Sequence, residues 1–234
     1  MSTDKVQQIR EGLLRWFQDV QRDLPWRRTR DPYAILVSEV MLQQTQVDRV
    51  IPYYARFLER FPTAHDLAEA PVAEVIKLWA GLGYNRRAVN LQRAAQVVVA
   101  EHDGQFPSDP EELRKLPGLG AYTSGAVAAF AFERDVVFLD TNMRRVITRL
   151  MFGTESVPER EVLAVAQELL PPGHGWVWNQ ALIEFGALQC TARKPACIVC
   201  PLTSQCAAFP HIQSALATAR PRSRPAERFE TSSR

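Results

Sequence analysis

Two carboxylates in contrasting surroundings are the first residues that could do chemistry. Glu39 is the only charged residue in the apolar run of residues 34–42. Burial of such a segment raises the pKa of its carboxyl, so Glu39 could serve as a general acid near neutral pH. Asp140 precedes the helical pattern 141–152, an N-cap position that favours an ionised carboxylate. Glycosidic cleavage needs such a pair, one protonating the leaving group and the other stabilising the oxocarbenium-like sugar.

Each carboxylate also has a simpler interpretation. Glu39 could lie on the exposed stripe of an amphipathic helix, although Ile35, Leu36, Val40 and Met41 leave little room for a wide solvent face. Capping alone would explain Asp140. The chemical interpretation therefore rests on the two residues taken together.

The four cysteines form a second candidate site. They fall within 17 residues, with the spacing C-x6-C-x2-C-x5-C, at Cys190, Cys197, Cys200 and Cys206. Four thiolates from one short segment indicate a metal or an iron–sulfur cluster rather than disulfides. Zinc sites of four cysteines usually show two separate C-x2-C pairs, and the sequence has one. The spacing favours a [4Fe–4S] cluster that stabilises a loop, with zinc as the alternative.

The segment Leu116-Pro117-Gly118-Leu119-Gly120 lies between two helical patterns. Proline ends the first helix, and the two glycines permit a tight turn with close backbone approach. The next helix then presents free N–H groups that can bind a phosphate. This arrangement is typical of a helix-hairpin-helix that grips a DNA backbone, and an ordinary tight turn between helices is the alternative.

Helices are the elements that must position these groups. Val6, Ile9, Leu13 and Phe17 predict a first amphipathic helix, and Asp31-Pro32 begins a second one over the apolar run 34–47. Further helical patterns cover residues 49–60, 64–70, 72–80, 86–102, 110–115, 121–132, 141–152, 158–170 and 176–189, punctuated by prolines 52, 62, 71, 107 and 110. Short β-like runs such as 135–139 are too few to build a sheet. The sequence therefore predicts an all-α fold.

Composition limits the class of protein. The chain has 234 residues, of which 46% are hydrophobic and 23% charged, so it is a globular protein of one or two domains. No apolar run approaches the roughly 20 residues of a membrane span, and no apolar signal region precedes the first helix. We therefore expect a cytoplasmic protein without a membrane partner.

The net charge is only +2, yet 24 of the 28 basic residues are arginine, which suits phosphate binding or reflects codon usage. Residues 213–234 are basic and poor in apolar side chains, which predicts a disordered tail.

Taken together, these motifs resemble the endonuclease III superfamily of DNA glycosylases. The resemblance rests on the hairpin, an aspartate about twenty residues later, and the cysteine loop. Four local segments, residues 24–27, 38–47, 81–84 and 179–184, resemble the catalytic portion of MutY-type adenine glycosylases. The resemblance covers about residues 8–210.

The resemblance implies a fold of two helical lobes with a DNA cleft between them. One lobe would be a helical-barrel domain of residues 24–135 that carries the hairpin. The other, residues 1–23 plus 136–212, would hold a [4Fe–4S] cluster on the four cysteines. The implied partner is double-stranded DNA with a mismatched or damaged base pair, bound by a monomer of bacterial type that acts at the nucleoid.

The resemblance also implies roles for individual residues. Glu39 would protonate N7 of adenine, Asp140 would stabilise the sugar cation, and Tyr122 would line the sugar site. Trp26, Arg27 and Glu184 would hold the extruded base, Gln43, Gln44 and Tyr84 would wedge into the base stack, and Leu116, Gly118 and Gly120 would meet the DNA backbone. Core packing is the simpler interpretation of Trp26 and Tyr84.

The expected activity is excision of adenine mispaired with guanine or 8-oxoguanine. Bifunctional relatives have a lysine where Tyr122 lies, so we expect no strong lyase activity. The main alternative is a G:T or G:U mismatch thymine or uracil glycosylase. A DNA-structure-binding module without chemistry is a third possibility, which the presence of both Glu39 and Asp140 argues against. The chain ends about 28 residues after Cys206, too few for the NUDIX-like domain of MutY-type enzymes, so we expect a natural short form or a truncated sequence.

Overall fold

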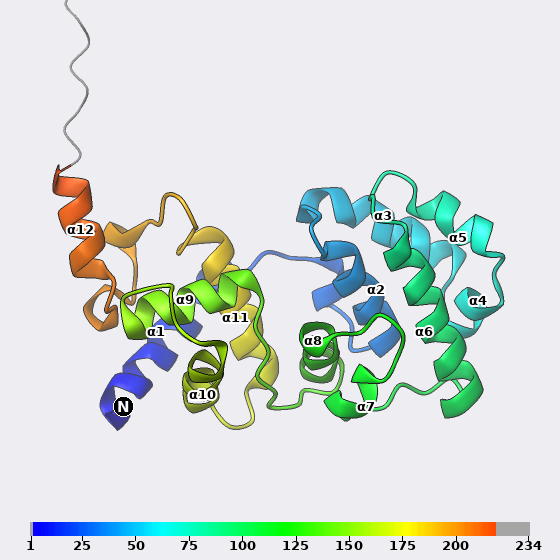
Figure 1. Ribbon diagram of the computed structural model, residues 1–234, viewed down its shortest axis with the longest axis horizontal. Coiled ribbons are helices and arrows are strands. Elements are labelled where there is room, and N and C mark those ends of the chain that lie inside the picture. Colours follow the sequence, from blue (N-terminus) through cyan, green and yellow to red (C-terminus); the bar gives the residue numbers. More distant parts are fainter. Residues whose placement is uncertain (1, 219–234) are drawn as a thin grey trace, which may run out of the picture.

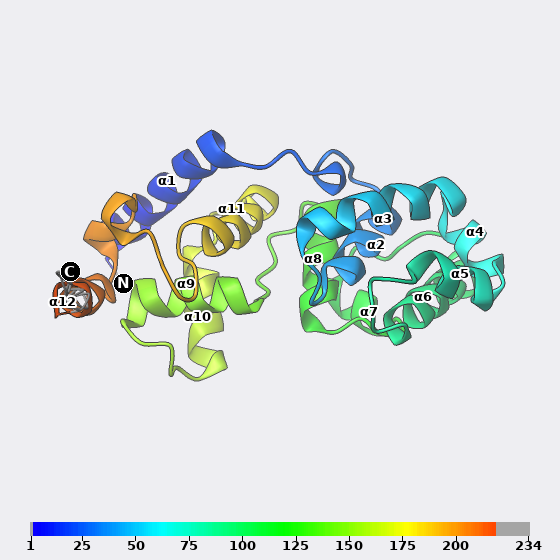
Figure 2. The same ribbon diagram turned by 90° about the horizontal axis from the view of Figure 1, so that it is seen from above.

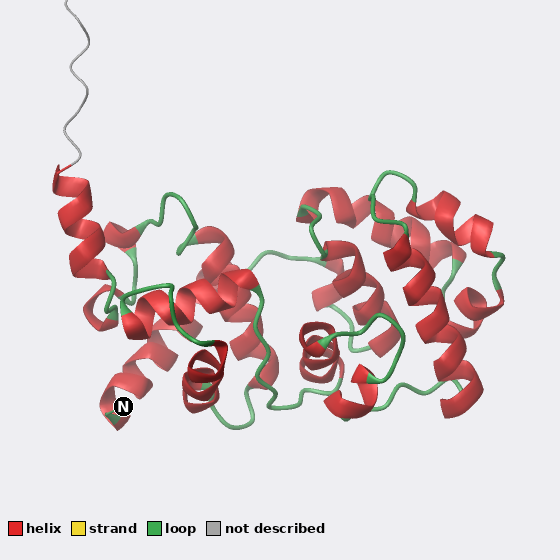
Figure 3. Cartoon of the chain, in the orientation of Figure 1, coloured by secondary structure: helices red, strands yellow, loops and turns green. Residues whose placement is uncertain are grey.

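The computed structural model describes residues 2–218, and the regular elements in this range are all helices (Figure 3). The α-helices are α1 (Thr3–Val20), α2 (Pro32–Leu42), α3 (Val47–Arg60), α4 (Ala64–Glu69), α5 (Val72–Trp79), α6 (Arg86–His102), α7 (Pro110–Arg114), α8 (Ala121–Ala131), α9 (Thr141–Phe152), α10 (Glu159–Leu169), α11 (Gly175–Leu188) and α12 (Phe209–Thr218). Three short 3-10 helices are η1 (Pro25–Arg27), η2 (Cys197–Val199) and η3 (Thr203–Gln205). The predicted all-α fold is thus confirmed for the described range, where no helix is long and apolar enough to cross a membrane.

The helices gather into two lobes (Figures 1 and 2). Helices α2 to α8 form one lobe, and α1 forms the other with α9 to α12. Two segments connect the lobes, residues 21–31, which include η1, and residues 132–140. The division into domains of residues 24–135 and of residues 1–23 plus 136–212 stays a prediction.

Helices α2 and α8 pack against each other in the first lobe and carry Glu39 and Tyr122. Both are buried over most of their length, which explains why neither shows an amphipathic pattern. Asp31 begins α2 by accepting hydrogen bonds from the N–H groups of Tyr33 and Ala34. Small residues let α8 approach its surroundings closely, since a Cβ added at Gly125 would lie 2.8 Å from Cβ of Phe138.

The second lobe is organised around α11. Helix α1 packs on it with its buried stripe of Ile9, Leu13 and Phe17, and Trp16 meets Phe185 edge-to-face at 4.9 Å between ring centroids. Helix α9 packs on another side of α11, and its N-terminus holds Asp140. The lobe therefore presents Asp140 where the chain enters from the other lobe.

Three local predictions are wrong in detail. The helix predicted over 34–47 ends at Leu42, because Gln44 adopts a left-handed backbone (φ 55°) and the guanidinium of Arg87 takes carbonyls that would continue the helix. Pro52 lies inside α3 and does not punctuate the helix that the sequence predicts over 49–60. Helix α12 extends to Thr218, so the predicted disordered tail begins too early. The rest of that prediction, residues 219–234, lies outside the described residues.

Candidate active site

Glu39 is buried in the C-terminal half of α2, with 5% of its surface exposed. The hydroxyl of Tyr122 on α8 donates a hydrogen bond to its Oε2 at 3.0 Å. Burial is the largest influence on the pKa of Glu39 and raises it, the Tyr122 hydrogen bond lowers it, the negative charge of Asp140 raises it and the charge of Arg27 lowers it. Together these influences raise the pKa of Glu39 to about 7. A large fraction of Glu39 is therefore a neutral acid at neutral pH.

Asp140 caps α9, as the sequence predicts. Its Oδ1 accepts a hydrogen bond from the N–H of Met143 at 2.6 Å, and its Oδ2 accepts one from Nδ2 of Asn142 at 3.2 Å. Both hydrogen bonds fix the orientation of this carboxylate at the N-terminal end of α9. The site thus combines a buried acid from one lobe with a hydrogen-bonded carboxylate from the other.

These groups line two adjoining pockets between the lobes. The inner pocket, of about 210 Å³, and the wider outer pocket, of about 750 Å³, share Glu39, Tyr122, Asp140 and Asn142. The inner volume lies below the several hundred Å³ of pockets for drug-sized ligands, which suits one small group. Glu39 and Asp140 can therefore act on a single group held between them.

Trp26 and Arg27, which the resemblance assigns to base binding, both line the inner pocket. Trp26 is 7% exposed and meets Tyr54 edge-to-face, so it also packs in the core. The pocket has polar lining residues that sequence reasoning missed, namely Arg22, Asn142 and Gln180. Gln180 lies in segment 179–184, which resembles the MutY-type enzymes, but nothing in the sequence marks it as a pocket residue. Arg22 lies in a polar stretch without a motif.

Glu184 is fully buried and lies behind the arginines. Its carboxylate accepts hydrogen bonds from the backbone N–H, Nε and Nη2 of Arg22 and from Nη2 of Arg27. A carboxylate can accept about four hydrogen bonds, so these four donors occupy all the acceptor positions of Glu184. Glu184 therefore orients Arg22 and Arg27 in the structure, and its contact with an extruded base stays a prediction.

Gln43 and Gln44 form a ridge between the outer pocket and a third pocket, of about 470 Å³, that Tyr84, Asn85 and Arg86 help to line. Tyr84 has a left-handed backbone (φ 50°) and 67% of its surface exposed, which excludes core packing as its role. Its ring is largely open to solvent, with the guanidinium of Arg87 5.6 Å from its centroid. Wedging by these three residues stays a prediction that their placement permits.

The predicted hairpin joins α7 and α8. Leu116 is buried, Gly118 has φ 81°, and a Cβ added at Gly118 would lie 2.6 Å from Cβ of Asn90. Glycine is required there by both backbone conformation and space. Gly120 is the N-cap of α8 and is exposed, so the first N–H groups of this helix are accessible to a phosphate.

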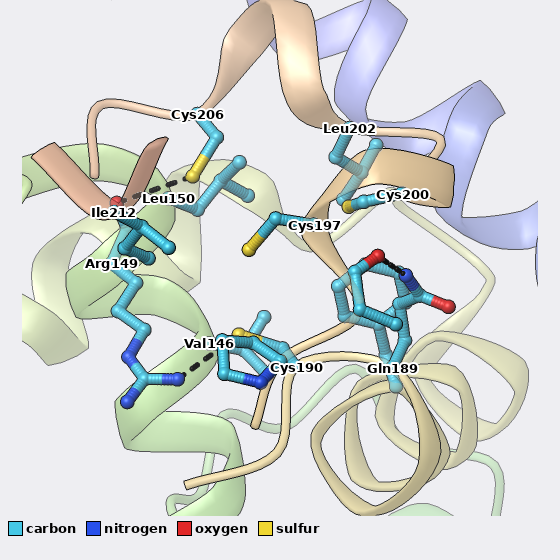
Figure 4. A pocket seen from close by; sticks show the side chains of 13 residues that line it. Val146, Arg149, Leu150, Gln189, Cys190, Cys197, Cys200, Leu202, Cys206 and Ile212 are labelled. Carbon is cyan, nitrogen blue, oxygen red and sulfur yellow. Dashed lines mark hydrogen bonds between the residues drawn. The ribbon is translucent and has the colours of Figure 1, made fainter. Parts of the chain in front are cut away.

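The four cysteines surround one cavity with an apolar wall (Figure 4). Cys190, Cys197, Cys200 and Cys206 are free thiols, and Arg149 approaches two of them, with Nη1 3.8 Å from Sγ of Cys190 and its carbonyl 3.6 Å from Sγ of Cys206. Within residues 2–218, no three His, Cys, Asp or Glu side chains converge closely enough to hold a single metal ion. Four soft thiolate ligands that line one cavity suit an iron–sulfur cluster, whose iron atoms cysteine thiolates hold.

The two lobes and the hairpin that begins α8 define the class of helix-hairpin-helix base excision DNA repair proteins. The model of the HhH-GPD superfamily of base excision DNA repair proteins matches residues 37–172, and the model of the iron–sulfur binding domain of endonuclease III matches residues 190–206. The chain belongs to the HhH-GPD superfamily and carries the [4Fe–4S] loop of endonuclease III on its four cysteines.

Relatives with assigned activities are similar over most of the chain. It is 47% identical over 194 residues to the adenine DNA glycosylase of Mycolicibacterium smegmatis, covering 82% of this chain and 66% of that protein. It is 41% identical over 222 residues to human adenine DNA glycosylase, covering 89% of this chain and 41% of that protein. The chain therefore spans less than two thirds of the length of these relatives.

Solved structures support the same fold. A thermostable thymine-DNA glycosylase superposes with a TM-score of 0.84 at 32% identity, covering 89% of this chain and 98% of that one. Endonuclease III in a non-covalent DNA complex superposes with a TM-score of 0.78 at 26% identity, covering 92% of this chain and 99% of that one. Both neighbours confirm the two-lobed helical fold.

Proposed function

We propose that this chain is a monofunctional DNA glycosylase that acts as a monomer and removes adenine mispaired with guanine or 8-oxoguanine. The observation that carries the proposal is the buried Glu39, whose pKa is about 7, facing Asp140 in one pocket. The 47% identity to an adenine DNA glycosylase supports adenine as the base.

The target nucleotide must leave the duplex to reach these groups, because a stacked base is inaccessible to buried side chains. The inner pocket receives the everted base next to Trp26 and Arg27. The ridge of Gln43 and Gln44, with Tyr84 beyond it, fills the gap left in the stack. The hairpin at Gly118 and Gly120 holds the backbone nearby.

Glu39 then delivers its proton to N7 of adenine. The N-glycosidic bond breaks, its electron pair leaves with the base, and the carboxylate of Asp140 stabilises the cationic sugar. The oxygen of a water molecule bonds to C1′, and the proton it releases restores the acid form of Glu39. The products are free adenine and an abasic site.

The same geometry argues against lyase chemistry. Schiff-base formation needs an amine at the sugar, and Tyr122 occupies the position next to Glu39. Lys115 precedes the hairpin and forms an ion pair with Glu112 at 2.7 Å. Borohydride reduction during the reaction should therefore trap little covalent protein–DNA adduct, and abundant adduct would contradict a monofunctional enzyme.

A thymine or uracil mismatch glycosylase is the second candidate, favoured by the superposition on a thymine-DNA glycosylase. Single-turnover excision from duplexes with A:G, A:8-oxoG, T:G and U:G pairs distinguishes the two. Adenine release from the first two supports the proposal, and release of thymine or uracil alone overturns it. DNA binding without release of any base would instead indicate a binding module.

The rate of excision should fall as pH rises through about 7. Only neutral Glu39 can protonate the base, so log(kcat/KM) should decline with a slope near −1 above the pKa of Glu39 in the free protein. Tyr122→Phe removes a hydrogen bond that lowers this pKa, so the decline should move to higher pH. A rate that stays constant to about pH 9, with DNA binding unchanged, would remove Glu39 from the acid role.

A further inference from the structure

The ridge and the tyrosine that the proposed function assigns to the base stack lie on two separate loops. Gln43 and Gln44 belong to the loop between α2 and α3, and Tyr84 belongs to the loop between α5 and α6. Each loop holds a non-glycine residue in the left-handed region, Gln44 at φ 55° and Tyr84 at φ 50°. Such conformations persist only where surrounding contacts enforce them. A residue that holds both loops would therefore decide whether both wedges enter DNA together.

The side chain of Arg87, in the first turn of α6, contacts both loops. Its Nη1 donates a hydrogen bond to the carbonyl of Gln43. Its Nη2 donates to the carbonyls of Leu82 at 3.2 Å and Gly83 at 3.1 Å, and approaches Oγ1 of Thr45 at 3.4 Å. One guanidinium thus joins the residues that flank Gln44 to the residues that precede Tyr84.

The same guanidinium caps the helix of the catalytic acid. Nη1 of Arg87 donates to the carbonyls of Val40 at 2.8 Å and Met41 at 3.2 Å, which follow Glu39 directly in α2. The last carbonyls of a helix lack partners within the helix and favour a nearby cation. Helix α2 has no basic residue of its own in its last turn. Arg87 therefore supplies from α6 the cap that α2 lacks.

The surroundings of Arg87 require an arginine. Its guanidinium lies 5.5 Å from the ring centroid of buried Trp79 and 5.6 Å from that of Tyr84, and Nε of Trp79 donates to the carbonyl of Gly83 at 3.2 Å. Nε of Arg87 is buried and has no hydrogen-bond partner within the described part of the chain. A lysine ammonium is a single point of charge and cannot reach the carbonyls of both loops at once.

We propose that Arg87 is a positioning residue that fixes the Gln43–Gln44 ridge and the Tyr84 loop as one unit at the end of α2, so that both wedges enter the base stack together. The inference rests on the proposed function, because it assigns both loops to DNA unstacking. Arg87 does not line the pocket that holds Glu39 and Asp140, so its effect on chemistry passes through the loops.

The test compares Arg87→Met and Arg87→Lys with Arg93→Met, an exposed arginine further along α6. Single-turnover excision of the base that the unchanged protein releases fastest is measured in two duplexes. One holds the mispair, and the other places the same base opposite an abasic site, where extrusion is easier. Both Arg87 variants should slow excision from the mispair on the order of 10²-fold, and from the abasic-opposed duplex less than about threefold. Arg93→Met should change neither rate.

Hydrogen exchange of the protein without DNA gives a second readout that needs no activity. In Arg87→Met, amides of residues 43–46 and of residues 82–85 should both exchange faster, while those around the cysteine loop stay unchanged. Equal slowing on both duplexes, or exchange that changes in neither loop, would overturn the proposal. If the unchanged protein releases no base from any duplex, the proposed function fails, and the exchange of the two loops still decides whether Arg87 joins them.

Discussion

Glu39→Gln is expected to lower the rate of base excision by about 10² to 10⁴-fold, the usual contribution of a positioned general acid. Glutamine has nearly the same shape and can still accept the hydrogen bond from Tyr122, but it has no proton to give. DNA binding should change little, because Glu39 lies in the buried interior of α2. Single-turnover excision and a binding titration on the same duplex measure the two effects separately.

The same substitution should stabilise the protein at alkaline pH. The pKa of Glu39 rises from 4.5 to about 7 on folding, so the contribution of this carboxyl to stability is full below pH 4.5 and is lost as pH rises through about 7. This difference between the pKa values of Glu39 in the folded and unfolded states lowers the free energy of unfolding by roughly 3 kcal/mol above pH 8. Glutamine avoids the loss because it never ionises. The Glu39→Gln variant should therefore unfold at a higher temperature than the unchanged protein at pH 8.5, and at a similar temperature at pH 5.

Glu59→Gln is the matched control, since Glu59 is an exposed carboxylate on α3 of the same lobe. It should leave both excision and the pH dependence of unfolding unchanged. The assignment of Glu39 as the acid would not survive undiminished excision by Glu39→Gln. An unfolding temperature that is equally low in both variants at pH 8.5 would show that Glu39 is not desolvated.

The parts of the site that the sequence predicts are those encoded locally. The single charge in the run 34–42 indicates the burial of Glu39, and the position of Asp140 before a helical pattern indicates its capping role. The four cysteines lie within 17 residues, so their spacing alone indicates a shared cluster. Each of these features depends on neighbours close in the chain, which a sequence displays directly.

The parts that could not be predicted depend on contacts between distant residues. Arg87 binds the carbonyls of Val40 and Gln43 at the end of α2, which lie 47 and 44 positions before it in the sequence. The apolar pattern 34–47 does not reveal this contact and therefore predicts a longer helix than the one that forms. Arg22 reaches the pocket because Glu184, 162 positions away, holds it there. The residues next to Arg87 and Arg22 in the sequence do not mark these two arginines out from the other arginines of the chain. Only the contacts made in the fold distinguish them.

The second large expected effect concerns this ion cluster of Glu184, Arg22 and Arg27. Glu184 has no exposed side-chain surface, and the side chain of Arg27 is 7% exposed. Removing one partner of a buried ion pair leaves the other charge uncompensated, so Glu184→Gln should destabilise the protein by about 3 kcal/mol or more. Glu74→Gln, which removes the partner of Arg60 at the surface, should cost less than about 1 kcal/mol. Denaturant unfolding of the three proteins at pH 7 makes the comparison.

The pH dependence separates the ion cluster from a general packing defect. Although burial raises it, hydrogen bonds from Arg22 and Arg27 lower the pKa of Glu184 to about 2. Its contribution to stability is therefore full above pH 4.5 and is lost as pH falls from there toward 2. The cost of Glu184→Gln should shrink over this range, whereas a packing defect would cost the same at every pH. Because Arg22 and Arg27 also line the inner pocket, excision by this variant should weaken even at temperatures where it stays folded.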